Sequence, residues 1–161
     1  MRVAFATCSL VPDGWPDDFE AAALLDADFL SWDDPAAYWG RYDRVLLRSV
    51  FNYTHRVEDF LAWCFALGAG RLLNPPELVS FNADKRYLAQ LAAPTVPTTF
   101  VCSPADLPEW DDEIVVKPNI SSGARDTGRF GPANACGRGC PRRADYGKRS
   151  GGAGSAVPCE R

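Results

Sequence analysis

The sequence predicts an α/β protein in which a doubly wound domain is followed by an incomplete second lobe and a disordered tail. Three observations favour this organisation. Short apolar segments alternate with segments of helical character, which is typical of a parallel sheet covered by helices. A later apolar segment ends on Lys117 and leads into a loop of small residues. After Phe130 the composition changes abruptly. We therefore divide the chain into residues 1–94, 95–130 and 131–161.

Three apolar segments are expected to form the sheet of the first domain. They are RVAFATC (2–8), ADFLSW (27–32) and DRVLLRSV (43–50). Each is a short apolar run bounded by charged or turn-forming residues, as buried strands are. Because the connections between them are long enough to hold helices, we expect the strands to run parallel.

Helices are expected between and after these strands. Acidic residues in the first turn and a run of alanine and leucine favour a helix over 17–27. A short helix is expected over 33–42, with an aspartate cap and Pro35 at its first position. The clearest helix is expected over 54–70, where apolar residues recur at the helical period, Thr54 can act as the cap and glycines end the pattern.

Two short helices and a strand are expected next. The helices cover 74–81 and 82–92, and Asn82 is the expected cap of the second. Residues 93–102 (APTVPTTFVC) are expected to form a strand that enters a new unit. Alanine–proline punctuation near 92–96 favours a domain boundary there.

The composition is normal for a soluble globular protein and excludes several classes of protein. Hydrophobic residues make up 47% and charged residues 24%, and no apolar run approaches the roughly 18 residues of a membrane span. The N-terminus is more typical of a first strand than of a signal peptide, so the cytoplasm is the expected location. Up to Phe130 the chain carries 11 basic and 19 acidic residues, a net charge of −8. Neither a nucleic acid nor a membrane is therefore expected as a partner.

The cysteines and the histidine of this part are expected to have structural roles. Cys8, Cys64 and Cys102 lie in apolar runs and are expected to be small buried hydrophobic residues. The single histidine, His55, excludes metal motifs that need two histidines. Because it lies beside a helix start, we interpret it as a solvated helix-end residue in preference to a catalytic one.

The segment with the most chemical content surrounds Lys117, which closes an apolar strand expected over 112–118. A sheet would hold this lysine rigidly, so its ammonium group can be presented to phosphate oxygens. The loop that follows is built from small residues, between which backbone N–H groups can approach an anion. These residues are Asn119, Ser121, Ser122, Gly123 and Ala124. A plain hairpin with the same pattern is the alternative.

Several spaced motifs, taken together, resemble the ATP-grasp ligases. In chain order they are NPPELVSFNADKRYLAQL, PTTF, and IVVKP followed by SSGA. The earlier stretch VLLRSVFNYTHRVEDFLAW resembles the glutathione-synthetase-like branch, which includes the O-ureido-serine cyclo-ligase of cycloserine biosynthesis. The resemblance covers residues 1–130, so the first domain is interpreted as a pre-ATP-grasp domain and the second as part of an ATP-grasp lobe.

The resemblance implies a nucleotide site and a reaction type. Lys85 and Lys117 match the two family lysines that contact the nucleotide phosphates. Residues 121–127, which end with Thr127, match the small-residue loop that folds over these phosphates. The implied chemistry is ATP-dependent ligation, in which a carboxylate is activated by phosphoryl transfer and a nucleophile displaces phosphate. ATP and Mg²⁺ are the implied cofactors and a small amino-acid-like molecule the implied substrate. No catalytic residue is assigned.

Substrate binding is expected at the carboxyl ends of the strands, where doubly wound sheets bind their ligands. Arg48 ends its strand and is a candidate for holding an anionic substrate group. A pairing with a surface acid is the alternative for this arginine. Asn52 and Tyr53 follow in the same loop and are candidates for substrate contacts.

The chain departs from the family pattern after Phe130. Family members continue into a second lobe that supplies acidic metal ligands, so no metal ligand is assigned here. Gly, Ala, Arg and Pro make up 20 of the 31 residues of 131–161, a composition that cannot bury a core. A cysteine metal site, a basic disordered tail and an out-of-frame reading of a GC-rich gene are the alternatives, and the out-of-frame reading is favoured.

The resulting expectation is a truncated ATP-grasp ligase with little or no activity. A nucleotide-binding or small-molecule-binding module without catalysis is the alternative. The oligomeric state is not predicted.

Overall fold

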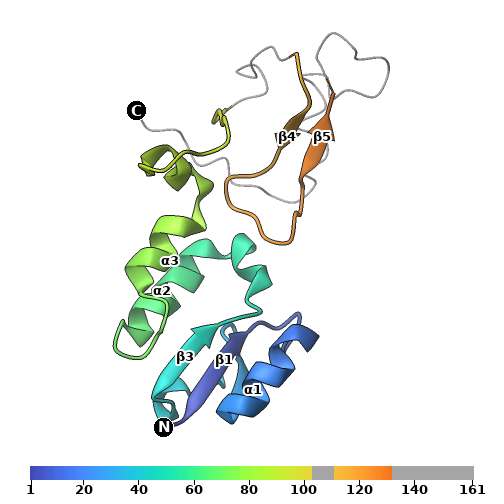
Figure 1. Cartoon of the computed structure of the whole chain (residues 1–161). Coiled ribbons are helices and arrows are strands. Elements are labelled where there is room, and N and C mark those ends of the chain that lie inside the picture. The colour runs from blue at the N-terminus through green and yellow to red at the C-terminus, as the bar shows by residue number, and fades with distance from the viewer. Residues whose placement is uncertain (103–110, 132–161) are drawn as a thin grey trace. The chain divides into compact units, whose positions relative to one another are not determined.

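The computed structural model describes residues 1–102 and 111–131 of the 161-residue chain (Figure 1). The chain divides into two compact units, Met1–Tyr87 and Leu88–Arg161. The tail interpreted as disordered spans 131–161, and its residues 132–161 lie outside the described residues. The domain limits at residues 94 and 130 stay predictions.

The first unit is built on a small parallel sheet with strand order β2-β1-β3. The strands are β1 (Val3–Thr7), β2 (Ala27–Ser31) and β3 (Arg44–Leu47), and β1 is parallel to both neighbours. A parallel bridge between Val45 and Leu72 continues this order beyond β3. All three strands expected for this domain are confirmed, and so is the α/β class.

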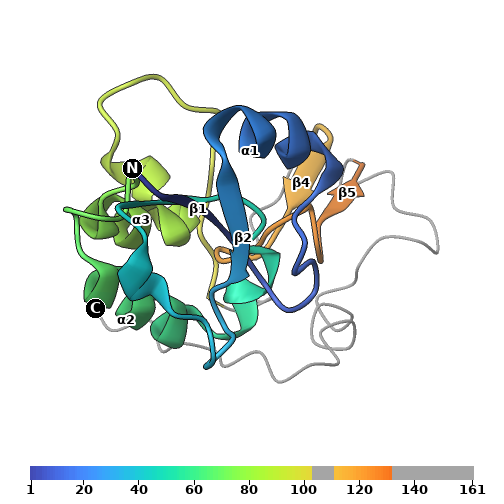
Figure 2. The ribbon, with the colours of Figure 1, turned by 90° about the horizontal axis from the view of Figure 1, so that it is seen from below.

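Helices cover both faces of this sheet (Figures 1 and 2). They are α1 (Phe19–Leu25), α2 (Val57–Leu67) and α3 (Pro76–Ala83). Successive side chains of a strand point to opposite faces, and β1 is buried throughout, so it packs against helices on both sides. One set of its side chains packs with α1, and the other set packs with α2 and α3. The first cluster contains Val3, Phe5 and Ala22; the second contains Ala4, Ala6, Val45, Phe60, Cys64 and Val79.

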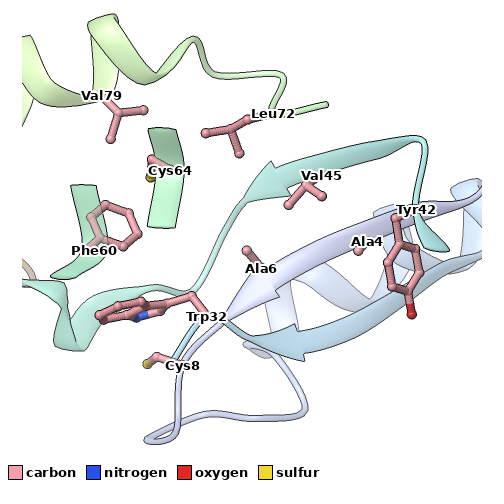
Figure 3. Packing of buried hydrophobic residues seen from close by; sticks show 10 residues of the cluster. All are labelled: Ala4, Ala6, Cys8, Trp32, Tyr42, Val45, Phe60, Cys64, Leu72 and Val79. Atoms are coloured by element: carbon pink, nitrogen blue, oxygen red, sulfur yellow. The ribbon is translucent and has the colours of Figure 1, made fainter. Parts of the chain in front are cut away.

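The larger cluster is rich in aromatic side chains (Figure 3). The Phe60 ring lies 5.1 Å from the ring of Trp32 and 5.8 Å from that of Trp63, measured between ring centroids. Cys64 is buried beside them, as expected, and burial raises the pKa of its thiol to about 12. This thiol therefore stays protonated at neutral pH and acts as a small hydrophobic group.

The helix expected over 33–42 is wrong. The Asp34 carboxylate accepts a hydrogen bond from the backbone N–H of Ala36 at 2.8 Å, so it closes a local turn. Only Trp39–Arg41 is helical in this segment, as a single 3-10 turn. Asp33, the other candidate cap, is engaged by a distant residue, Ser9.

The helix expected over 54–70 exists, but its expected cap is wrong. Thr54 belongs to a 3-10 turn, Phe51–His55, and α2 begins after Arg56. His55 ends this turn and is exposed, as interpreted from the sequence. Gly68, with a positive φ of 75°, ends α2 as expected.

The second of the two short helices is also different from the expectation. Asn82 lies inside α3, and Asp84 ends that helix in an extended conformation. The Asp84 carboxylate then accepts hydrogen bonds from the backbone N–H and the guanidinium of Arg86, both at 2.9 Å. These bonds start a separate 3-10 helix, Lys85–Gln90, in place of an α-helix.

The strand expected over 93–102 is wrong, since these described residues form no strand. Pro94 and Pro97 lack the N–H group that a strand ladder needs, and they restrict the residues before them. Cys102 at the end of this segment is exposed, so its expected burial is wrong too.

The described part of the second unit is an antiparallel hairpin of β4 (Ile114–Val116) and β5 (Gly128–Phe130). Figure 1 shows the two strands side by side, joined by a long loop. Arg129 pairs with Glu113 across the hairpin at 2.9 Å. The strand expected over 112–118 is therefore confirmed, although it is shorter. Within residues 1–102 and 111–131, no helix is long and apolar enough to cross a membrane.

Candidate functional site

The carboxyl ends of the three parallel strands meet at one edge of the sheet. Thr7 pairs with Ser31, and Ala6 pairs with Leu47, so the strands leave the sheet at nearly the same level. The chain then continues into polar residues after each strand. These are Ser9 after β1, Asp33 after β2, and Arg48, Ser49 and Asn52 after β3. We refer to these five residues and Asp18 as the carboxyl-edge cluster.

Arg48 is held in this cluster by an ion pair with Asp18. Its Nε and Nη2 atoms lie 2.7 Å and 2.6 Å from the same Asp18 oxygen, Oδ1. The Ser49 hydroxyl donates to the other oxygen, Oδ2, at 2.7 Å. The Asp18 side chain is only 6% exposed, whereas that of Arg48 is 42% exposed. The acid is thus the buried partner, and the guanidinium faces solvent in part.

The environment of Asp18 favours its charged form. Burial alone would raise the pKa of this carboxyl group, but the hydrogen bonds from Ser49 and Arg48 and the charge of Arg48 outweigh it. The pKa of Asp18 is therefore lower than its ordinary value of 3.8. The pair stays ionised at neutral pH.

Asn52 joins the ends of the strands in a second network. Its amide oxygen accepts from the Trp32 indole at 2.7 Å, and its amide nitrogen donates to Asp33 Oδ2 at 2.6 Å and to the Ser9 hydroxyl at 3.3 Å. Ser9 in turn donates its backbone N–H and its hydroxyl to Asp33, at 2.9 Å and 2.6 Å. The network fixes the three loops to one another, and the predicted substrate contact of Asn52 stays a prediction.

Acid is expected to destabilise this edge of the sheet. Burial would raise the pKa of Asp33, but hydrogen bonds from Ser9 and Asn52 outweigh it and lower the pKa below 3.8. Because the folded-state pKa values of Asp18 and Asp33 are depressed, their contribution to stability is fully present above about pH 5. It is lost as the pH falls below 3.8. Urea unfolding followed between neutral pH and acid is expected to show this loss.

Replacement of each acid by asparagine measures how much that acid contributes to the loss of stability in acid. The pH dependence of the free energy of unfolding is expected to be flatter in Asp18→Asn and Asp33→Asn than in the parent protein. The exposed Asp17, which lies beside Asp18 in the sequence, provides the control variant Asp17→Asn. A pH dependence unchanged in both cluster variants would contradict the prediction.

Tyr53 lies in the 3-10 turn that follows β3 and is half-buried. Its ring packs against Phe60, 5.1 Å away between centroids, and burial raises the pKa of its hydroxyl. This ring is part of the packing around the larger core cluster. Its predicted contact with substrate stays a prediction.

Lys85 begins the 3-10 helix after α3 and is half-buried. Lys85 adjoins Asp84 in the sequence. Burial would raise the pKa of the Asp84 carboxyl group, but the hydrogen bonds from Arg86 and the charges of Arg86 and Lys85 outweigh burial, so the pKa is lowered. Lys85 thus lies in the first unit.

Lys117 lies in the second unit, directly after β4, and is exposed. The pairing of Val116 with Gly128 places Lys117 and Thr127 at the two ends of the loop that joins β4 to β5. The loop therefore starts at the candidate phosphate lysine and returns beside it in an antiparallel hairpin, the arrangement named above as the alternative, and phosphate binding stays a prediction. The other predicted phosphate contacts, Ser121, Ser122, Gly123 and Ala124, all lie within this loop.

The loop contains three residues in the left-handed region of backbone conformation. They are Gly123, Ala124 and Asp126, with φ of 61°, 56° and 54°. A β-carbon built on Gly123 meets no atom within 4 Å, so the space on this side of the backbone is open. Ala124 and Asp126 adopt a conformation that costs roughly 1–3 kcal/mol each in residues other than glycine.

The sequence identified only part of the carboxyl-edge cluster. Ser9 and Asp33 lie two residues after the ends of β1 and β2, so the rule that selected Arg48 after β3 would have found them. Asp18 carries no comparable signal in the sequence. It lies 30 residues from Arg48 and reaches it only through the packing of the segment before α1. The acid predicted as the alternative partner of Arg48 exists, but it is buried and not on the surface.

Comparisons with known proteins agree with the resemblance seen in the motifs. Residues 3–74 match the family model of the N-terminal domain of D-cycloserine synthetase DcsG. The cycloserine biosynthesis protein DcsG of Streptomyces lavendulae is 33% identical over 138 residues, covering 71% of this chain and 46% of that protein. The crystal structure of D-cycloserine synthetase DcsG matches with a TM-score of 0.64 and 28% identity, covering 93% of this chain and 53% of that one.

The chain spans about half the length of these two relatives. Its similarity to them supports the cycloserine-biosynthesis branch of the resemblance and a ligase-like biosynthetic role. The residues after β3 that suggested this branch, Arg48 to Tyr53, lie inside the matched range 3–74.

Proposed function

We propose that this chain carries the phosphate-binding and substrate-binding parts of an ATP-dependent ligase of the ATP-grasp type. The observation that carries the proposal is the hairpin on which Lys117 leads into a glycine-containing loop, in a chain similar to D-cycloserine synthetase. The substrate class we propose is a small amino-acid-like molecule. The ligation reaction is proposed for the whole enzyme.

The described residues of the hairpin fit the phosphates of a nucleotide. Lys117 is an exposed cation at the end of a strand. The loop after it contains Gly123, beside whose backbone there is open space in which N–H groups could approach a phosphate. The left-handed conformations of Ala124 and Asp126 are of the kind that concentrates at ligand-binding loops. Lys85 is the second proposed phosphate contact, and the motif NPPELVSFNADKRYLAQL supports it.

Mg²⁺ is not assigned to residues of this chain. Among the described residues, no group of three or more histidine, cysteine or acidic side chains could hold a metal ion. When bound, the nucleotide would supply the phosphoryl group that activates a carboxylate. The residues described here would bind and orient: Lys117 and its loop act on the phosphates, and Arg48 acts on an anionic group of the substrate.

Replacement of Lys117 by alanine is expected to weaken binding of MgATP about tenfold or more, because a charge-assisted hydrogen bond to phosphate is lost. The affinity can be measured by calorimetry on the full chain. The matched control is Arg129→Ala, which removes one positive charge from the same hairpin. Equal loss in both variants would show only a general effect of charge, and an unchanged affinity in Lys117→Ala would contradict the assignment.

The same preparation tests ligation against simple binding. Release of phosphate that depends on an added amino acid would support the ligase function. Binding of MgATP without any turnover is the result expected of a ligase chain with little or no activity, and also of the alternative proposal, a nucleotide-binding module without catalysis.

A further inference from the structure

The ion pair between Asp18 and Arg48 leaves one edge of the guanidinium available. An arginine carries five N–H donors in a planar fork. The Nε atom and Nη2 are directed to a single oxygen of Asp18, Oδ1, and the second oxygen is taken by Ser49. The donors on the outer edge, Nη1–H and the second Nη2–H, are not used in these bonds. They belong to the side chain that is 42% exposed.

The guanidinium is also restrained on one face. Its central carbon lies 5.8 Å from the centroid of the Phe5 ring, which is buried in the core on the α1 side of the sheet. Asp18 is almost fully buried and accepts a hydrogen bond from the Ser49 hydroxyl. Ser49 follows Arg48 directly at the end of β3. The inner edge of the arginine is thus held by the Asp18 carboxylate, and Ser49 holds that carboxylate in turn. The arginine lies at the carboxyl end of the sheet, where substrates of such folds bind.

We propose that Asp18, supported by Ser49, is a positioning residue that aims the outer edge of Arg48 at the carboxylate of the substrate. This inference rests on the proposed function and deepens it, because it names the substrate group that the cluster recognises. Two parallel N–H groups of a guanidinium match the two oxygens of a carboxylate, which gives both orientation and affinity.

The charge balance of the cluster favours a monocarboxylate over a phosphate chain. Asp18 cancels the charge of Arg48, and Asp33, whose partners Ser9 and Asn52 are neutral, gives the cluster a net charge of −1, so the cluster has no excess positive charge with which to attract a polyanion. Residues 1–130 as a whole carry a net charge of −8. A carboxylate needs only the correctly aimed pair of donors, whereas a triphosphate needs several cations. The resemblance in the motifs implies Lys85 and Lys117, and not Arg48, as the contacts of the phosphates.

The alternative is that the pair only stabilises the fold, and the two roles predict opposite results for Asp18→Asn. If Asp18 merely neutralises Arg48, its replacement frees a positive charge and carboxylate binding becomes tighter. If Asp18 aims Arg48, the guanidinium loses its fixed orientation and carboxylate binding becomes weaker. The direction of the change therefore separates the two roles.

The test uses the full chain, D-serine as the probe and D-serinamide as its partner without a carboxylate. Both are titrated in NMR experiments that observe the arginine Nε–H signals. We expect the parent protein to bind D-serine about tenfold or more tightly than the amide, and Asp18→Asn to lose a similar factor for D-serine only. Asp17→Asn is the matched control and is expected to bind both probes as the parent does. Asp18→Glu is expected to recover part of the affinity.

Two further measurements protect the test against a variant that fails to fold. Ser49→Ala keeps the ion pair but removes one bond to Asp18, and it is expected to weaken D-serine binding by a smaller factor. In the parent protein, the Nε–H of Arg48 is expected to exchange with solvent more slowly than that of Arg56, whose partner Asp59 is exposed. Equal exchange rates, or tighter D-serine binding in Asp18→Asn, would overturn the inference.

The outcomes also separate this inference from the proposed function. Loss of MgATP binding in Lys117→Ala, in a protein that does not bind D-serine, would refute the carboxylate site and leave the nucleotide site standing. D-serine binding that depends on Arg48 and Asp18, in a protein that does not bind MgATP, would refute the proposed function and leave the carboxylate site standing.

Discussion

Replacement of Phe60 by alanine is expected to lower the free energy of unfolding by about 3–5 kcal/mol, the usual cost of removing a buried phenyl ring. Phe60 is 2% exposed and lies at the centre of the aromatic cluster. Its ring centroid is 5.1 Å from those of Trp32 and Tyr53. The cavity left by the ring cannot collapse easily, because its neighbours are themselves large and held by other contacts. Urea unfolding followed by circular dichroism measures the change.

The same helix provides the control for this prediction. Phe65 of α2 is 49% exposed, so Phe65→Ala is expected to cost less than about 1 kcal/mol. A second consequence concerns the site. Trp32 packs on Phe60 and donates its indole N–H to Asn52, so Phe60→Ala is also expected to loosen the network at the carboxyl edge. Equal losses of stability in the two variants would contradict this account of the core.

Replacement of Arg48 by alanine is expected to destabilise the protein more than replacement of its partner. Arg48→Ala leaves the Asp18 carboxylate buried without its countercharge, which is expected to cost about 3 kcal/mol, the lower end of the range for a broken buried pair. Asp18→Asn leaves a guanidinium that is 42% exposed and can turn to water, so it is expected to cost less. Denaturant unfolding of both variants at neutral pH measures the asymmetry.

Acid provides a second signature of the same asymmetry. Without Arg48, the pKa of Asp18 is expected to rise, because burial would no longer be offset by the arginine. The deficit of Arg48→Ala is therefore expected to shrink as the pH falls and the carboxyl group becomes protonated. Arg129→Ala breaks an exposed pair and serves as the control, with an expected change within about 0.5 kcal/mol. A larger loss in Asp18→Asn than in Arg48→Ala would show that the acid is not the more buried charge.

The sequence predicted the sheet well because its signal is local. Three short apolar runs correspond to β1, β2 and β3, and the run of β1 is the most apolar because this central strand is buried on both faces. The position of Arg48 at a strand end was visible for the same reason. The hairpin strand β4 before Lys117 was also predicted, because an apolar run followed by proline and a loop of small residues marks a strand end.

Three of the expectations that failed concerned polar residues that were expected to cap helices. Asp33, Thr54 and Asn82 are all residues that can cap a helix. Asp33 is bound by Ser9 and Asn52 from other loops, and Asn82 lies inside α3 because the polar residue that ends this helix is Asp84. A capping preference states what a residue can do, and the tertiary contacts decide which partner it takes.

By itself, the sequence determined the α/β class, the three parallel strands, and the positions of Arg48 and Lys117 at strand ends. Each of these follows from apolar periodicity and turn chemistry within a few neighbouring residues. Only the tertiary structure decided that Asp18 holds Arg48 and that Asn52 joins three strand ends. Those contacts connect residues 19 to 43 positions apart, and they form because the parallel sheet brings its carboxyl ends to one edge.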